Sequence, residues 1–213
     1  MRLWQRLGMR ERERVTQIGL GLLMIVVGFI WLAPFLWMLS TALKPTAEIY
    51  KLPLAWLPVD PTLEHFFSSL RAAPFGRYYL NSFIVAATTT AITLLIASMG
   101  GYAMARLSYR GRNVMMGAML SSTMIPFQVL LIPFFILMTM LKLVNSWGGL
   151  ILAYLAIFLP FATFMFRAYF IDLPRETEES ARIDGCSWFG VYWRAALPLA
   201  RPVIAAVGIY VFI

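Results

Sequence analysis

The amino-acid sequence predicts an all-α protein that crosses a membrane several times. Hydrophobic residues make up 61% of the 213 residues and charged residues only 13%, whereas a soluble domain is about 45–50% apolar and about 25% charged. Charges are also absent from four long intervals, each of which exceeds the roughly 20 apolar residues that a membrane-spanning helix needs. These observations exclude an ordinary soluble enzyme and a disordered chain.

The four charge-free intervals predict four complete membrane-spanning helices, and a fifth apolar segment begins near the end of the sequence. All are rich in Leu, Ile, Val, Phe and Met. The fifth segment is too short to cross a bilayer at about 1.5 Å per residue. We therefore expect the sequence to be a piece of a longer protein. The predicted spans are residues 16–43, 79–105, 113–141, 145–166 and, incompletely, 202–213 of a membrane domain at 16–213.

The basic residues predict the orientation of these spans. Most of the 18 Lys and Arg residues lie in the N-terminal tail (residues 1–15), in the loop after the second span and in the loop after the fourth span. Because Lys and Arg mark the cytoplasmic side, we expect the N-terminus and both loops in the cytoplasm. Within the tail, Arg residues at every fourth position fit either a helix lying on the membrane surface or a solvated basic segment.

The sequence predicts neither a catalytic site nor a bound cofactor or metal. Its one cysteine, Cys186, and its one histidine, His65, are expected on opposite sides of the membrane, so they form no pair for nucleophilic catalysis or metal binding. No lysine lies in a phosphate-binding loop, and the basic residues form no continuous stripe that would predict a nucleic-acid partner. Energy for uphill transport would therefore have to come from another chain.

The loop at residues 167–201 predicts a first short cytoplasmic helix. Pro174 suits the first turn of a helix, and Gly185 is well placed to end it. Three acidic residues near the expected N-terminal end favour the positive end of the helix dipole. One of them is spaced for an i,i+4 ion pair with Arg182. The acidic residues are Glu176, Glu178 and Glu179, and the one spaced for that pair is Glu178.

A second short helix is predicted directly after the first. Ser187 can cap its N-terminus, and Pro198 is expected to close or kink it. Helical spacing places Trp188 and Tyr192 on one face, with Val191 beside them. Such a helix pair could lie on lipid headgroups or bind a soluble protein. The acidic first turn favours the protein, because the inner leaflet is negatively charged.

The same loop resembles the Glu-Ala-Ala loop of ABC importer permeases. The family pattern reads Glu-Ala-Ala-x-x-Asp-Gly, a spacer, and then a hydrophobic residue, any residue, Leu and Pro. The sequence follows this order, with Ser in place of the first Ala and with Cys after the Gly where a small Ala is usual. The matching positions are Glu179, Ser180, Ala181, Asp184, Gly185, Leu197 and Pro198.

Shorter stretches are similar to the sugar-importer branch of these permeases, which includes the maltose permease G subunit. They lie at the outer edge of the first span, at the start and the end of the second span, inside the third span and at the start of the fourth. The resemblance as a whole extends over most of residues 34–202. The similar stretches are residues 34–45 with Glu48, 81–82, 101–112, 124–133 and 145–151.

The resemblance implies a type I ABC importer permease fold in a bacterial or archaeal inner membrane. It implies that the chain forms half of a translocation pathway for a carbohydrate or related solute. The implied partners are a second homologous permease, two ABC ATPase subunits that hydrolyse ATP, an extracytoplasmic solute-binding protein and membrane lipid. A permease for a non-sugar solute such as glycerol phosphate, an ion-coupled secondary carrier and a non-transporting membrane anchor remain the alternatives.

The resemblance also assigns expected roles within the loop, which would act as a coupling helix in a groove of the ATPase. Polar contacts with the groove are expected from Glu179 and Asp184, and the bend from Gly185. The expected apolar contact surface consists of Trp188, Val191 and Tyr192.

Three polar residues inside the spans are candidates for lining the translocation path. Gln128 lies between two prolines of the third span, and an amide in lipid must find a hydrogen-bond partner. It therefore either faces the solute or bonds a neighbouring helix. Thr89 and Thr93 either line the path or bond the backbone of their own helix.

A stripe of small residues in the second span predicts close helix packing. Ala97, Gly101 and Ala105 recur at every fourth position, so they share one helix face and let another backbone approach closely. The neighbouring helix could belong to this chain or to the partner permease.

Overall fold

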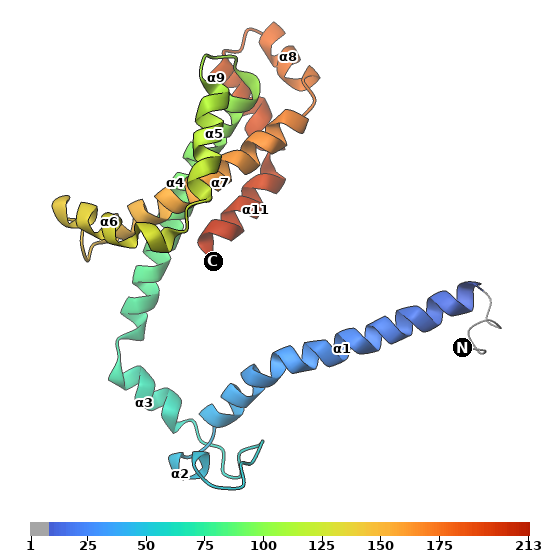
Figure 1. The fold of residues 1–213 in the computed structure, drawn as a ribbon, viewed down its shortest axis with the longest axis vertical. Coiled ribbons are helices and arrows are strands. Elements are labelled where there is room, and N and C mark those ends of the chain that lie inside the picture. Colours follow the sequence, from blue (N-terminus) through green and yellow to red (C-terminus); the bar gives the residue numbers. More distant parts are fainter. Residues whose placement is uncertain (1–8) are drawn as a thin grey trace. The chain divides into compact units, whose positions relative to one another are not determined.

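Every regular element in the described residues, 9–213, of the computed structural model is a helix, which confirms the all-α prediction (Figure 1). The chain divides into two units, Met1–Phe75 and Gly76–Ile213, and each is described by itself. Three helices in the described part are long and apolar enough to cross a membrane, and there are five spans if each of two bent helix pairs counts as one. The expected apolar segments are therefore present. One bent pair lies within the predicted third span, and the other joins Trp188–Leu199 of the predicted loop to Arg201–Phe212 at the fifth segment.

The first unit consists of α1 (Met9–Ala42) and the shorter helices α2 (Thr46–Ile49) and α3 (Glu64–Ala72). The most apolar stretch of α1 has a mean hydropathy of 2.4, and none of it is buried by the rest of the chain. A helix that is apolar and uncovered on all sides is suited to contact lipid. Part of the expected basic tail, residues 1–15, lies outside the described residues, and residues 9–15 form the first turns of α1.

The loop after α1 folds back onto the end of that helix. Ser40 Oγ donates a hydrogen bond to the carbonyl of Trp56, and Lys44 Nζ donates one to the carbonyl of Ala55. The Lys44 ammonium also lies 4.6 Å from the centre of the Trp37 ring. The Trp37 and Trp56 rings pack edge to face at 5.0 Å. A carbonyl and an aromatic face thus hold a lysine that is only 3% exposed.

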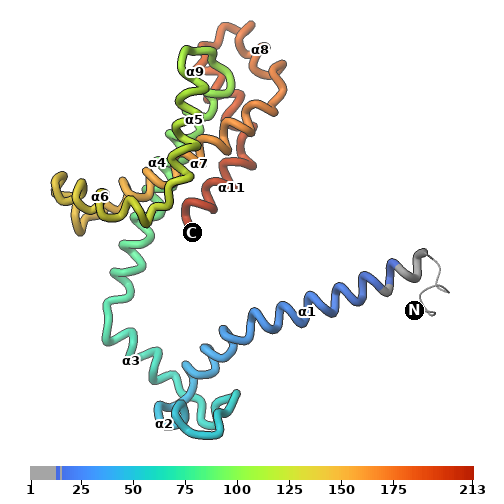
Figure 2. Tube along the Cα trace, viewed as in Figure 1, coloured from blue at the N-terminus to red at the C-terminus, as the bar shows by residue number. Residues whose placement is uncertain are grey.

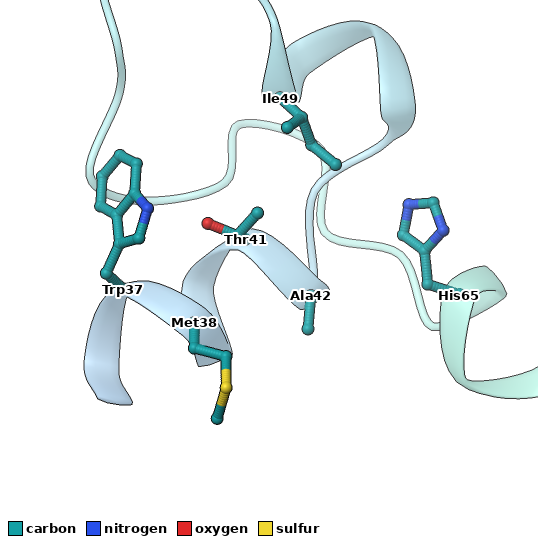
Figure 3. Close-up of a pocket in the computed structure, with 6 residues that line it drawn as sticks. All are labelled: Trp37, Met38, Thr41, Ala42, Ile49 and His65. Atoms are coloured by element: carbon teal, nitrogen blue, oxygen red, sulfur yellow. The ribbon is translucent and has the colours of Figure 1, made fainter. Parts of the chain in front are cut away.

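An open cavity of about 470 Å³ lies beside the end of α1, and Figure 3 shows Trp37 and His65 on opposite sides of it. A ring nitrogen of His65 lies 2.9 Å from the carbonyl oxygen of Lys44. This contact ties α3 to the end of α1, so His65 has a structural role within the unit. The other lining residues are Met38, Thr41, Ala42 and Ile49.

In the second unit, α4 (Phe75–Arg106) and α7 (Trp147–Asp172) contain the second and fourth predicted spans almost completely. The predicted span 145–166 begins two positions before α7, and α7 continues beyond residue 166 to Asp172. The charge of Arg167 suggests a membrane boundary, but it does not end a helix, because Arg is a good helix former.

The third predicted span, residues 113–141, is not one straight helix. It is divided into α5 (Arg112–Thr123) and α6 (Phe127–Met140), which meet at an angle of 100°. Pro126 lies at the break, with φ −59° and ψ 129°. Proline has no N–H to continue a helix, and it disfavours helical geometry in the preceding residue. The charge-free interval is therefore continuous in sequence but bent in space.

The core of the second unit lies where α4, α7 and the C-terminal helix α11 (Arg201–Phe212) meet (Figure 2). Ala97 is fully buried there. A Cβ atom built on Gly101 would lie 2.6 Å from Phe166 Cβ and 2.8 Å from the backbone nitrogen of Arg167. The small-residue stripe therefore packs closely as predicted, and the helix that it contacts is α7 of the same chain.

Candidate functional site

The loop after α7 folds into two helical arms. The first is α8 (Glu176–Ile183), which the sequence predicts except that Pro174 precedes the helix and does not lie in its first turn. The second is less regular than predicted, since α9 (Trp188–Val191) and α10 (Leu197–Leu199) flank a π-helical turn at Tyr192–Ala196. The proline within α10 lacks an N–H and its ring crowds the preceding turn. A wider π-turn accommodates such a disruption.

The first arm ends at Gly185, which has φ +83°. Its N–H donates to the carbonyl of Arg182, and the N–H of Cys186 donates to the carbonyl of Ala181, both at 3.0 Å. This pair of bonds is a Schellman motif, which satisfies the last carbonyls of a helix and requires a left-handed residue. The predicted bend is therefore present and depends on the glycine.

Ser187 begins the second arm, and its Oγ accepts a hydrogen bond from the N–H of Gly190 at 3.2 Å. The residue has an extended backbone, with φ −67° and ψ 164°. Both features are typical of a helix N-cap, so the sequence-based prediction for Ser187 is confirmed.

Loss of this cap is expected to destabilise the second arm. We expect Ser187→Ala to lower the free energy of unfolding by about 1 kcal/mol, because the N–H of Gly190 loses its acceptor. Thermal unfolding of the purified protein in detergent measures this change. Ser180→Ala is the matched control, since the exposed Ser180 hydroxyl only donates to the carbonyl of Thr177 in its own helix. Equal midpoints for the two variants would contradict the prediction.

The ten loop positions assigned from the sequence divide into exposed, half-buried and buried groups. Val191 is 0% exposed and Tyr192 is 3% exposed, so neither belongs to the apolar outer surface that was expected from helical spacing. Tyr192 packs against α4, where its hydroxyl lies 2.8 Å from that of Ser98, and it belongs to the core cluster. Ala181 and Leu197 are half-buried, and the exposed positions are Glu179, Ser180, Asp184, Gly185, Trp188 and Pro198.

The exposed surface of the loop combines acidic and aromatic groups. Glu179 and Asp184 are exposed on α8 and at its end. The Arg182 guanidinium lies 4.2 Å from the centre of the Trp188 ring, and this cation–π contact joins the two arms. Arg182 therefore pairs with an aromatic ring and not with Glu178, contrary to the i,i+4 spacing. This surface is suited to contact a protein with both basic and apolar groups.

The inward surface of the loop contains an ion pair that the sequence analysis missed. Glu178 Oε1 lies 2.8 Å from Arg106 Nε, and the two side chains are 8% and 5% exposed. Arg106 Nη2 also donates to the carbonyl of Leu173 at 2.7 Å. The Tyr102 hydroxyl donates to Glu178 Oε2 at 3.4 Å. Arg106 lies within the similar stretch 101–112 and is the last residue of α4, and that position was the available signal.

The candidates for the translocation path lie in different environments. Gln128 is exposed in the first turn of α6, directly after the break at Pro126. Thr89 and Thr93 are 1% and 0% exposed. Their hydroxyls have no hydrogen-bond partner within the described part of the chain. The expected bonds to their own helix are therefore not formed, and the chain does not bring Gln128 and the two threonines together on one exposed surface.

Comparison with known proteins places this fold and loop in a family. Residues 97–213 match the family described as "Binding-protein-dependent transport system inner membrane component". The chain is 37% identical over 182 residues to the sulfoquinovosyl glycerol transport system permease protein SmoH of Agrobacterium fabrum, covering 85% of this chain and 64% of SmoH. It is 34% identical over 196 residues to the arabinooligosaccharides transport system permease protein AraQ of Bacillus subtilis, covering 90% of this chain and 69% of AraQ.

A third relative and a solved structure agree with these matches. The diacetylchitobiose uptake system permease protein DasC of Streptomyces coelicolor is 35% identical over 189 residues, covering 88% of this chain and 68% of DasC. The chain thus spans about two thirds of the length of these relatives. A crystal structure of a bacterial ABC transporter that imports the acidic polysaccharide alginate shares the fold, with a TM-score of 0.83, 23% identity and coverage of 94% of this chain and 70% of that one. The chain therefore belongs to the family of binding-protein-dependent transport system inner membrane components.

Proposed function

We propose that this chain is a transmembrane subunit of an ATP-driven importer for a carbohydrate or a related solute. The observation that carries the proposal is the loop after α7, in which the family pattern coincides with a Schellman bend at Gly185 and an exposed acidic and aromatic surface. The names of the relatives support the solute class, since those proteins carry sugar-containing molecules and oligosaccharides. The subunit works in the inner membrane of a bacterium or archaeon.

The orientation follows from the charges. Arg residues concentrate in the N-terminal tail and in the loops on the side of α8, and such bias marks the cytoplasmic side. The N-terminus and the two-armed loop therefore face the cytoplasm. ATP hydrolysis takes place on a separate chain, since this sequence has no phosphate-binding loop.

The exposed surface of the loop is the contact for that ATPase. Glu179 and Asp184 pair with basic groups of the ATPase, and Trp188 with its stacked Arg182 fills an apolar part of the groove. Closure of two ATPase subunits moves this loop and a second one on a homologous permease. An extracytoplasmic binding protein delivers the solute to the opposite side of the membrane.

The translocation path is formed between this subunit and the homologous permease. Gln128 is the candidate that is exposed in the isolated chain, so its amide is available to a solute. The buried Thr89 and Thr93 hydroxyls become available only when α4 separates from its neighbours.

Reconstitution tests this function. The full-length subunit is purified with its partner permease and ATPases, placed in liposomes with the binding protein, and supplied with labelled carbohydrates or glycerol phosphate. We expect ATP-dependent uptake and co-purification of the ATPase. Glu179→Lys is expected to reduce uptake at least about tenfold, because it sets a like charge against the basic groove. Glu176→Lys, at another exposed position of α8, is the control. Uptake driven by an ion gradient without ATP would refute the proposal.

A further inference from the structure

We propose that Arg106 and Glu178 are positioning residues that make α8 move as one body with α4 and α7. The pair would pass a displacement of the loop to the membrane spans. This inference rests on the proposed function, because the displacement is the one that the ATPase applies to the exposed surface of the loop. The exposed surface of α8, which includes Glu179, would then bind the ATPase. The buried surface, which includes Glu178, would transmit the displacement to α4 and α7.

Arg106 bridges the joint between α7 and α8. Its Nε contacts Glu178 Oε1 at 2.8 Å, and its Nη2 donates to the carbonyl of Leu173 at 2.7 Å. Arg106 is the last residue of α4, Leu173 follows the last residue of α7, and Glu178 lies on α8. One guanidinium on α4 therefore bonds both the end of α7 and α8, and the planar group with several N–H donors is suited to hold the three elements in one arrangement.

The burial of the Arg106–Glu178 ion pair indicates that it holds α4 and α8 in a fixed arrangement, in addition to any electrostatic stabilisation. The Arg106 and Glu178 side chains are 5% and 8% exposed. An exposed ion pair contributes little and lets its partners separate easily, whereas removal of one partner from a buried pair leaves an uncompensated charge. Apolar residues often stabilise such a site equally well, so a buried pair is best explained where one particular arrangement is required.

A second set of contacts joins both arms of the loop to the same face of α4. Ser98, Tyr102 and Arg106 lie four residues apart, which places them on one stripe of the helix. The Tyr102 hydroxyl reaches Glu178 of the first arm at 3.4 Å. The Ser98 hydroxyl lies 2.8 Å from the hydroxyl of Tyr192 in the second arm, and the rings of Tyr102 and Tyr192 are 5.3 Å apart. Both arms of the loop therefore contact the same face of α4.

The adjacent residues Glu178 and Glu179 differ in burial, and this difference distinguishes the buried surface of α8 from its exposed surface. Glu178 is buried against α4, whereas Glu179 is exposed. Rotation of α8 about its own axis would expose Glu178 and break its bonds to Arg106 and Tyr102. The Arg106–Glu178 ion pair thus fixes which side of α8 is exposed. It also limits how far the loop can move independently of α4.

The first experiment measures solute imported per ATP hydrolysed in the reconstituted complex. We expect Glu178→Gln, which keeps the shape but removes the charge, to lower this ratio about tenfold while ATP hydrolysis continues. Exchange of the charges by Arg106→Glu with Glu178→Arg is expected to restore the ratio only in part, because a glutamate at position 106 cannot donate to the carbonyl of Leu173. Glu176→Gln is the control, because Glu176 is exposed on the same helix. A wild-type ratio in Glu178→Gln would overturn the inference.

The second experiment measures the distance between α8 and the end of α4. Spin labels are attached at Ser108→Cys and Ile183→Cys, both at exposed positions, after Cys186→Ser removes the one native cysteine. We expect the same distance with and without ATP when Glu178 is present, and a broad or shifted distance in Glu178→Gln. A distance that changes with ATP in the wild-type pair would overturn the inference.

Further variants keep the result interpretable if Glu178→Gln does not accumulate in the membrane. Arg106→Lys retains the charge opposite Glu178, but a single ammonium is not suited to bond Glu178 and the Leu173 carbonyl in the same geometry. An intermediate transport ratio is expected, and full coupling in this variant would overturn the inference. A wild-type complex that neither hydrolyses ATP nor imports solute would count against the proposed function. The spin-label distances between residues 108 and 183 would still test the Arg106–Glu178 ion pair.

Discussion

Gly101→Ala is expected to lower the free energy of unfolding by about 1–3 kcal/mol. The added methyl group would lie 2.6 Å from Phe166 Cβ and 2.8 Å from the backbone nitrogen of Arg167. Non-bonded carbon atoms pack best at about 3.5–4.0 Å, and the atoms in the way are next to or part of the backbone of α7. The chain can relieve the overlap only by moving α4 away from α7, which loosens the core of the second unit.

The neighbouring glycine provides the control for this prediction. A Cβ atom on Gly100 would meet Thr163 Cγ2 at 3.5 Å, an ordinary van der Waals contact. Gly100→Ala is therefore expected to leave stability unchanged or to raise it, since Ala favours a helix over Gly by about 1 kcal/mol. Thermal unfolding of both variants in the same detergent checks the comparison. Equal unfolding midpoints for Gly100→Ala and Gly101→Ala would contradict the packing argument.

Gly185→Val is expected to abolish coupling between ATP hydrolysis and uptake while membrane insertion stays normal. Gly185 has φ +83°, and a Cβ atom there would meet nothing within 4 Å. The effect therefore comes from the backbone, because a β-branched residue disfavours left-handed geometry. We expect the bend to open, α8 to change its angle to the second arm, and uptake in liposomes to fall at least about tenfold.

Two further variants test whether the loss of coupling depends on the position of Gly185 or only on backbone strain in any loop. Gly111 has φ +87° and also has open space around it, so Gly111→Val imposes a similar strain in another loop and is expected to retain coupling. Gly185→Asn is expected to retain more uptake than Gly185→Val, since Asn tolerates the left-handed region. Wild-type uptake by Gly185→Val would refute the proposed role of the bend.

The apolar segments and the helix ends of the loop were predictable because they depend on local properties. Span prediction requires only the length and hydropathy of a charge-free interval, and α4 and α7 follow it closely. Gly185 and Ser187 were predictable for a similar reason, since caps involve residues within one turn. The break at Pro126 illustrates the limit, because the proline marks a weak point but neighbouring packing determines the angle.

The partners of Glu178 and Tyr192 and the burial of Val191 were not predictable from spacing. The i,i+4 rule favours Arg182 for Glu178, yet the structure pairs Glu178 with Arg106, 72 residues away in the sequence. Helical spacing likewise treats Trp188 and Tyr192 as neighbours on one surface, whereas Tyr192 is buried against α4. Local patterns describe which residues share a face but not which face the rest of the chain covers.

The sequence by itself determined the helical class, the apolar segments, the positions of the loop bends and the resemblance to importer permeases. These features follow from composition, from charge-free length and from short-range hydrogen bonding. Only the tertiary structure decided that the small stripe at Gly101 contacts α7, and that of the adjacent Glu178 and Glu179 the first is buried and the second is exposed. The physical reason is that burial and ion pairing depend on segments far apart in sequence, whose approach no local pattern specifies.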